Sequence, residues 1–219
     1  MESKKYPRTP HLPYSPGGTD DDERLLSVDH FIGQEVVITE KMDGENMGET
    51  CGTLYARSHN GAPPHPSFDL AKATWACHRF QIPEGVTVFS EWCFAEHSIH
   101  YSGLPNYRLV FGVRDDGTRE AWSWDEVCDM ATELGVPTVP ELWRGQILNE
   151  KHLRQLVDGF VKVRSVCDGL REGVVVRLVG RISLEAWELS IAKWVRPNHV
   201  KPDDAHWRTK PIVRNGLRK

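Results

Sequence analysis

The sequence has no long apolar run and no cysteine framework. Nowhere does it approach the ~20 consecutive apolar residues of a membrane-spanning helix, and its first residues, MESKKYPRTP, contain no apolar signal core. Its five cysteines are odd in number, lie far apart and form no Cys-x-x-Cys pair, which argues against a disulfide framework or a structural zinc site. We therefore expect a soluble, intracellular and cytoplasmic protein whose thiols are reduced.

The chain also has little net charge and no internal repeat. Its net charge is −4 over 219 residues, which argues against bulk electrostatic binding of nucleic acid but is compatible with a local basic groove. With 39% hydrophobic residues, the chain is long enough to bury a sizeable core. No linker divides it, so we expect one main domain and a monomer.

The hydrophobic pattern predicts strands separated by a few helices. Strands are expected over residues 36–41, 53–59, 86–94, 107–115, 172–180 and 188–197, where short β-branched or alternating runs meet turn residues. Helices are expected over 68–80, after the capping box of Ser123 and Glu126, and over 149–166. The last two strands should be joined by a short connection through Gly180. The pattern indicates an α+β fold of mostly antiparallel strands.

Both ends of the chain differ in composition from its middle. Residues 1–30 combine the Pro-rich stretch PRTPHLPYSPGG with the acidic run DDDE, which predicts a surface arm and not a domain. Residues 31–200 form the predicted main domain. Residues 201–219 form a predicted basic tail, which either tracks a phosphate backbone or is a frayed, solubilising end; its basic residues are Arg208, Lys210, Arg214, Arg218 and Lys219.

Polar residues gather at the ends of the predicted strands. In chain order, the segments KMDG, SEWCF, FGVRD, REGVVVR and AKWVR resemble the nucleotidyltransferase motifs of the ATP-dependent RNA ligases, relatives of DNA ligases and mRNA capping enzymes. A lone Lys-x-Asp-Gly is weak, whereas five segments in this order are specific, and they cover residues 35–197. The form Glu-Lys-x-Asp-Gly-x-Asn, from Glu40 to Asn46, is typical of the RNA-sealing branch.

The resemblance implies an adenylation domain of antiparallel sheets with flanking helices that uses ATP and Mg²⁺ or Mn²⁺. Lys41 would attack the α-phosphate of ATP and carry AMP, which requires its amine to lose its proton. Glu172 would hold the metal, since magnesium takes only one or two carboxylates and keeps several waters. Lys193 would neutralise the α-phosphate. The partner would be nicked or broken RNA with 5′-phosphate and 3′-hydroxyl ends.

Further residues would surround the nucleotide. Phe111 would stack on adenine or simply belong to the core, and Arg57 would contact the ribose or a phosphate or lie on the surface. Glu91 would accept a hydrogen bond from a ribose hydroxyl or be a strand-end surface acid. Asn46 would touch phosphates or a metal-bound water, and Glu40 is another nucleotide-binding candidate.

The remaining motif positions are less informative. Asp43 and Gly44 complete the Lys-x-Asp-Gly motif. The loop AEHSIH offers acidic and histidine side chains but no third metal ligand, which predicts a polar loop.

The sequence departs from the family in two places. Some RNA ligases have two lysines, two residues apart, in the last motif; here Val195 stands at the partner position. The following Arg196 either takes over a phosphate contact or leaves it absent. The residues after Pro197 are also too few for the OB-fold of DNA ligases and capping enzymes, so we expect none.

Two alternatives remain at this stage. One is a compact DNA ligase, which sealing of DNA nicks would test. The other is a nucleotide-binding or RNA-binding module of the same fold that has lost turnover. The presence of Lys41, Glu91, Glu172 and Lys193 argues against such a module, because a decayed site would tolerate their loss.

Overall fold

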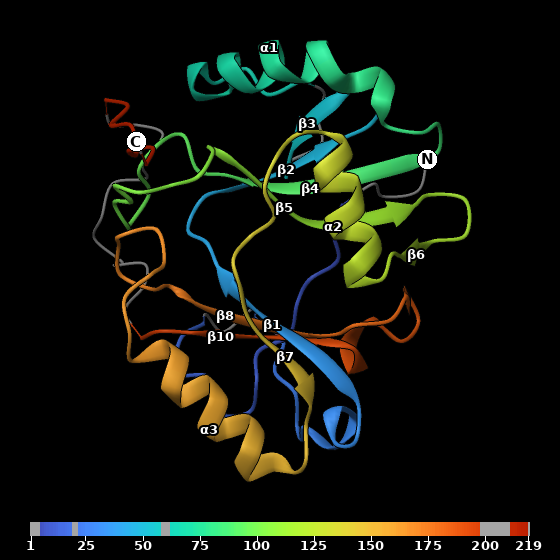
Figure 1. Ribbon diagram of the computed structural model, residues 1–219, viewed down its shortest axis with the longest axis vertical. Coiled ribbons are helices and arrows are strands. Elements are labelled where there is room, and N and C mark those ends of the chain that lie inside the picture. The colour runs from blue at the N-terminus through green and yellow to red at the C-terminus, as the bar shows by residue number, and fades with distance from the viewer. Residues whose placement is uncertain (1–4, 19–21, 58–61, 198–210, 219) are drawn as a thin grey trace.

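Two antiparallel sheets face each other in the computed structural model, which describes residues 5–18, 22–57, 62–197 and 211–218 (Figure 1). The lower sheet has the strand order β10 (Ile191–Val195), β8 (Gly173–Leu178), β1 (Glu35–Lys41) and β7 (Glu141–Gln146). The upper sheet has the order β3 (Leu54–Ala56), β2 (Glu45–Glu49), β4 (Val86–Trp92), β5 (Arg108–Asp115), β6 (Glu120–Ala121) and β9 (Ile182–Ser183). The predicted α+β class with antiparallel sheets is confirmed.

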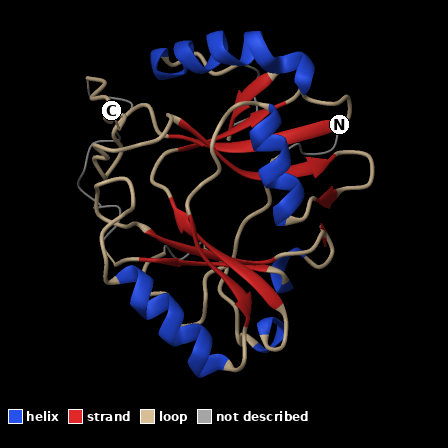
Figure 2. Ribbon diagram, viewed as in Figure 1, coloured by secondary structure: helices blue, strands red, loops and turns tan. Residues whose placement is uncertain are grey.

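In the described part of the chain, the α-helices α1 (Asp69–His78), α2 (Trp124–Glu133) and α3 (Glu150–Val161) flank the sheets (Figure 2). The predicted capping box starts α2, with both Ser123 and Glu126 in their expected contacts. The helix α3 ends at Val161, earlier than predicted. The Arg171 guanidinium donates to the carbonyls of Phe160 (2.8 Å), near the end of α3, and Arg164 (3.0 Å), beyond it. The 3-10 helices are η1 (Asp29–Phe31), η2 (Pro66–Phe68), η3 (Arg79–Gln81) and η4 (Trp187–Leu189). No helix among the described residues has the length and apolar character of a membrane span.

Strand β1 lies inside the lower sheet, paired with β7 and β8. Its β-branched residues Val36 and Ile38 are fully buried in a core shared with α3. Because successive side chains of a strand alternate between faces, Thr39 and Lys41 point to the opposite face. That face looks toward the upper sheet, and Lys41 stands where the chain leaves the lower sheet for β2.

The connection between β8 and β10 differs from the short link predicted through Gly180. Strand β9 lies within it and pairs with β6 of the upper sheet, with Ile182 opposite Ala121. These two residues share a small core with Trp187 and Ile191. A single excursion of the chain therefore ties the two sheets together.

The N-terminal arm runs along the outer edge of β10. The Leu12 N–H donates to the Lys193 carbonyl (2.8 Å), the Lys193 N–H to the Pro10 carbonyl (2.8 Å), and the Gly17 N–H to the Val195 carbonyl (2.9 Å). The arm thus covers an edge that would otherwise be open, and it fixes the backbone on both sides of Lys193.

The described part of the tail is docked on the upper half of the molecule. Arg214 pairs with Ala95 and Leu217 with Leu104. The buried Asn215 side chain accepts from the Tyr101 N–H (2.8 Å). Arg208, Lys210 and Lys219, named above as part of a basic tail, lie outside the described residues. The division into arm, main domain and tail stays a prediction.

Candidate active site

A cavity of about 790 Å³ lies between the two sheets, within the range of about 300–1,000 Å³ typical of small-molecule sites. Both sheets contribute to its lining, as does the N-terminal arm. Eight of the predicted site residues line it: Glu40, Lys41, Gly44, Asn46, Arg57, Glu91, Phe111 and Lys193. The fold therefore gathers segments that are far apart in the sequence around one space.

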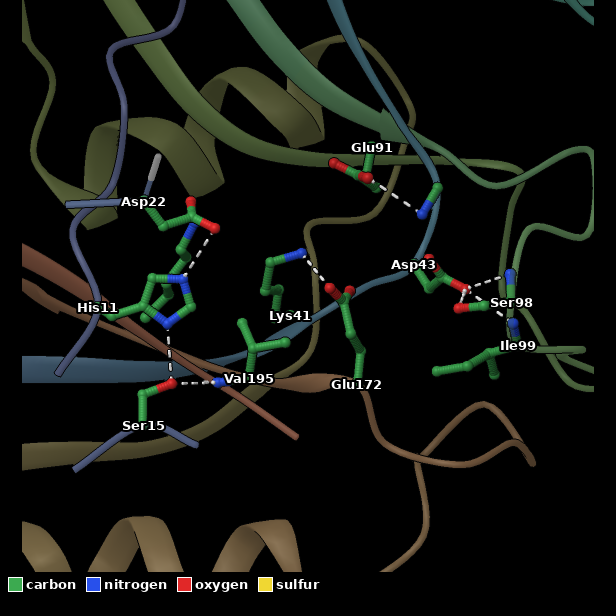
Figure 3. Close-up of polar contacts among 12 residues, drawn as sticks. His11, Ser15, Asp22, Lys41, Asp43, Glu91, Ser98, Ile99, Glu172 and Val195 are labelled. Carbon is green, nitrogen blue, oxygen red and sulfur yellow. Dashed lines mark hydrogen bonds and ion pairs between the residues drawn. The ribbon is translucent and has the colours of Figure 1, made fainter. Parts of the chain in front are cut away.

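Lys41 and Glu172 form an ion pair at this cavity (Figure 3). The Lys41 Nζ donates to the Glu172 Oε1 at 2.5 Å. Their side chains are 28% and 3% exposed, so the carboxylate is buried and the lysine side chain is half-buried. The β1–β8 register explains the pairing, because it places Lys41 opposite Gly173, the residue after Glu172. A side chain at Gly173 would collide with the Trp194 carbonyl.

The ion pair holds the Lys41 proton more tightly than sequence reasoning anticipates. Burial lowers the pKa of Lys41, but the negative charges of Glu172 and Glu91 together raise it by more. The resulting pKa lies above the ordinary value of lysine. Lys41 is therefore an ammonium group in this arrangement. It becomes a nucleophile only when the charge of the Glu172 carboxylate is neutralised.

Asp43 and Gly44 shape the turn that follows Lys41. The Asp43 Oδ2 accepts hydrogen bonds from the Ser98 N–H (2.9 Å), the Ser98 hydroxyl (2.9 Å) and the Ile99 N–H (2.7 Å) (Figure 3). A Cβ atom on Gly44 would lie 2.8 Å from the Trp92 carbonyl oxygen. These two motif residues therefore hold the turn in place, and the Asp43 carboxylate is directed to the 98–99 loop.

Glu91 on β4 is a second half-buried carboxyl group near Lys41. Its Oε1 accepts from the Gly44 N–H at 3.1 Å (Figure 3). Burial raises the pKa of Glu91 from 4.5 to about 8, although the nearby charge of Lys41 opposes this shift. At neutral pH Glu91 therefore carries a proton and can donate a hydrogen bond as well as accept one.

Comparison with known proteins identifies the family of the chain that carries this site. The family model described as RNA ligase matches residues 34–195, a segment that contains the Lys41–Glu172 pair and Lys193. The chain belongs to the RNA ligase family. None of the curated proteins compared with the sequence matches it.

Solved RNA ligases share the fold at low sequence identity. An archaeal ATP-dependent RNA ligase aligns with a TM-score of 0.55 and 15% identity over 88% of this chain and 48% of its own. A Naegleria gruberi RNA ligase variant without nucleotide gives 0.53 and 14% over 77% and 51%. Another variant of that enzyme, solved with ATP and Mn, gives 0.54 and 12% over 90% and 61%. This chain thus spans about half to three-fifths of the length of these structures.

The side chain of Glu40 in this RNA ligase family member points away from the cavity. Its Oε2 accepts from the Arg171 guanidinium (3.2 Å) and from the Val166 N–H (3.2 Å). Strand alternation explains this, because Glu40 and Lys41 are neighbours in β1 and face opposite sides. A nucleotide contact from Glu40 would have to involve its main chain, so that prediction now concerns the backbone only.

Phe111 and Arg196 are placed differently from each other. Phe111 lines the cavity and also packs against the upper core, with the Tyr6 ring edge-on at 4.9 Å. Phe111 therefore belongs to the edge of the core and also faces the cavity. Its stacking on adenine stays a prediction. Arg196 is not among the lining residues; its N–H donates to the Glu172 carbonyl at 2.9 Å. Its nucleotide contact stays a prediction.

Arg177 and Asp22 are among the cavity residues that the sequence does not predict. Arg177 of β8 is buried, lines the cavity and donates to the Trp122 carbonyl at 2.7 Å. The alternation of β8 holds a signal for it, since Val175 and Arg177 share the face toward the cavity. Asp22 of the arm contacts Lys193 at 3.0 Å, and no local pattern indicates a contact across so much of the chain.

The acidic groups around Lys41 fit a magnesium or manganese ion of the kind bound partly by phosphates. Among the described residues, no group of three or more His, Cys, Asp or Glu side chains could hold a metal by itself. Magnesium commonly uses one or two carboxylates and completes its shell with phosphates and waters. Glu172, whose charge raises the pKa of Glu91, could provide one carboxylate, and Glu91 could provide the other once a cation displaces its proton.

The raised pKa of Glu91 predicts a pH-dependent stability difference. The folded protein binds this proton more tightly than the unfolded chain, so wild-type stability falls as pH rises from 4.5 to about 8. Glu91→Gln stays neutral and keeps an acceptor for the Gly44 N–H. Relative to wild type, the variant should gain about 1–3 kcal/mol of unfolding free energy between about pH 5 and about pH 8.5, measured by urea denaturation. A constant difference between these pH values would mean that Glu91 is ionised in the folded protein.

Proposed function

We propose that this chain is an ATP-dependent RNA ligase that joins 5′-phosphate and 3′-hydroxyl ends through a lysyl-AMP intermediate. The observation that carries the proposal is the Lys41–Glu172 pair, at 2.5 Å, at a cavity of nucleotide size in a member of the RNA ligase family. Solved structures with the same fold include a ligase variant bound to ATP and Mn, which supports the choice of ATP and a divalent metal.

In the first step, Lys41 Nζ forms a bond to the α-phosphorus of ATP while the bond to the pyrophosphate oxygen breaks. The amine first gives up its proton to water, because Glu172, its partner at 2.5 Å, is the carboxylate that would hold the metal. Lys193 and Arg177, which line the same cavity, balance the negative charge of the phosphates. Such positioning and charge neutralisation are most of what phosphoryl-type transfer needs from a protein.

Glu172, together with Glu91, would hold the divalent metal. Bound there, magnesium or manganese would offset the phosphate charge and the carboxylate charge that now raises the pKa of Lys41. Burial of Lys41 would then dominate, and its pKa would fall toward that of a usable nucleophile.

The second and third steps act on RNA. The AMP passes from Lys41 to the 5′-phosphate, with a phosphate oxygen of the RNA displacing the lysine amine. The 3′-hydroxyl then attacks this activated phosphorus and AMP leaves, which seals the strand. We propose a cytoplasmic location for this activity. We assign it to a monomer, because one chain provides Lys41, Lys193 and Glu91 to the cavity and Glu172 as the partner of Lys41.

Sugar discrimination at a nick tests the choice of RNA over DNA. We expect ribonucleotides to be required on the 3′-hydroxyl side, while the 5′-phosphate strand can be DNA or RNA, because telling the two apart needs contacts to 2′-hydroxyls or A-form shape. Four nicked duplexes that vary the sugar on each side, with preadenylated 5′ ends, measure the sealing step alone. Equal sealing of an all-DNA nick would favour the compact DNA ligase instead.

A further inference from the structure

The N-terminal arm places a carboxylate on Lys193 at the cavity. The Asp22 Oδ1 accepts from the Lys193 Nζ at 3.0 Å, and both residues line the cavity. The second carboxylate oxygen lies 3.7 Å from His11 Nε2 (Figure 3). The Asp22 side chain is 33% exposed whereas that of His11 is 1% exposed. The Asp22 carboxylate is therefore partly accessible to solvent, and the imidazole that it contacts is buried.

His11 is itself oriented by Ser15 and β10. The Val195 N–H donates to Ser15 Oγ at 2.9 Å, and Ser15 Oγ lies 2.8 Å from His11 Nδ1 (Figure 3). In the tautomer that carries its proton on Nε2, the Ser15 hydroxyl donates to Nδ1 and the ring N–H lies on the side of Asp22. Burial and the charge of Lys193 lower the pKa of His11 to about 4, so the ring is neutral.

These contacts form a series that begins and ends on β10. From Val195 it passes through Ser15, His11 and Asp22 to Lys193, and the step of 3.7 Å between His11 and Asp22 is longer than a hydrogen bond. The ammonium group of Lys193 thus has an anion of the same chain as its partner, and a phosphate of a bound nucleotide would need that same group.

We propose that Asp22 is a resident anion that occupies Lys193 until the phosphates of a nucleotide displace it. The inference rests on the proposed function, which assigns Lys193 to phosphate. A carboxylate and a phosphate that both bind the Lys193 ammonium group would lie close together, and their like negative charges would repel each other. The Asp22 side chain therefore leaves Lys193 as the phosphates enter and returns when they depart, so it competes with the substrate for Lys193.

Ligand binding to Asp22→Asn tests this competition, because the substitution removes the charge and keeps the size. Calorimetry without divalent metal compares ATP, inorganic tripolyphosphate and adenosine. We expect ATP and tripolyphosphate to bind roughly two- to tenfold more tightly to the variant, and adenosine to bind equally. Asp29→Asn is the matched control, since Asp29 is exposed on the same arm and does not line the cavity; it should change none of the three.

A Lys193→Ala background separates competition from general electrostatics. There the effect of Asp22→Asn should vanish, because the amine for which the anions compete is absent. The proposal is overturned if Asp22→Asn leaves tripolyphosphate binding unchanged or weaker, or if it tightens binding equally without Lys193. A wild-type protein that never forms lysyl-AMP would refute the ligase function while leaving these binding results intact. The ligase function and the competition by Asp22 can therefore be refuted independently.

Discussion

Replacing Lys41 by alanine should abolish the AMP adduct that ATP and magnesium form on the wild-type protein. Alanine removes the only amine in the Lys41–Glu172 pair, and the carboxylate that remains cannot form the phosphoramidate. Lys41→Arg should fail as completely, because a guanidinium group stays protonated in proteins. Intact-mass spectrometry after incubation with ATP and magnesium measures both variants.

Lys72→Ala provides the matched control for this experiment. Lys72 lies on α1, paired with Asp69 at 2.8 Å, and does not line the cavity. It should keep the full adduct. An undiminished adduct in Lys41→Ala or Lys41→Arg would place the nucleophile at another residue.

Glu172→Gln should slow adenylation of Lys41 by about 10²–10³-fold, the usual effect of losing one preorganised group that stabilises charge at a reacting centre. Two effects oppose each other in this variant. The loss of the negative charge lowers the pKa of Lys41 and so favours the free amine, but it also removes the carboxylate that would hold the metal. We expect the second effect to dominate, because Lys193 and Arg177 balance only part of the phosphate charge and the metal that Glu172 would hold balances the rest.

Single-turnover rates across a magnesium titration measure this variant, because they separate weaker metal binding from a slower reaction. Glutamine keeps the size of glutamate and an acceptor for the Lys41 Nζ, so the fold should be retained. Glu185→Gln, an exposed acid in the connection to β10, is the control and should react at the wild-type rate. Wild-type rates for Glu172→Gln at every magnesium concentration would remove Glu172 from the mechanism.

Local sequence patterns predicted the elements that carry the site. The run Val36 to Thr39 is β-branched and became the buried centre of β1, which ends at Lys41 as expected. The capping box of Ser123 and Glu126 fixed the start of α2. The predicted strands around Glu91 and Lys193 also formed. These features depend on neighbours within a few residues, which is why the chain reveals them without its fold.

Contacts between distant segments could not be predicted in the same way. Arg171 binds Glu40 and also donates to the Phe160 carbonyl near the end of α3. Nothing near these residues in the sequence indicates either contact. The arm reached the edge of β10, and Asp22 reached Lys193, through hydrogen bonds that depend on the complete lower sheet. Nor does the sequence show that Glu172 lies 2.5 Å from Lys41 and raises the pKa of its amine.

The measurement that tests the central claim most directly is the mass of the wild-type protein after separate incubations with ATP, GTP and NAD in magnesium, followed by sequencing of the modified peptide. The account predicts one AMP per chain from ATP, attached to Lys41, and no such adduct from GTP or NAD. An unmodified protein after incubation with ATP, or AMP attached to a residue other than Lys41, would contradict it.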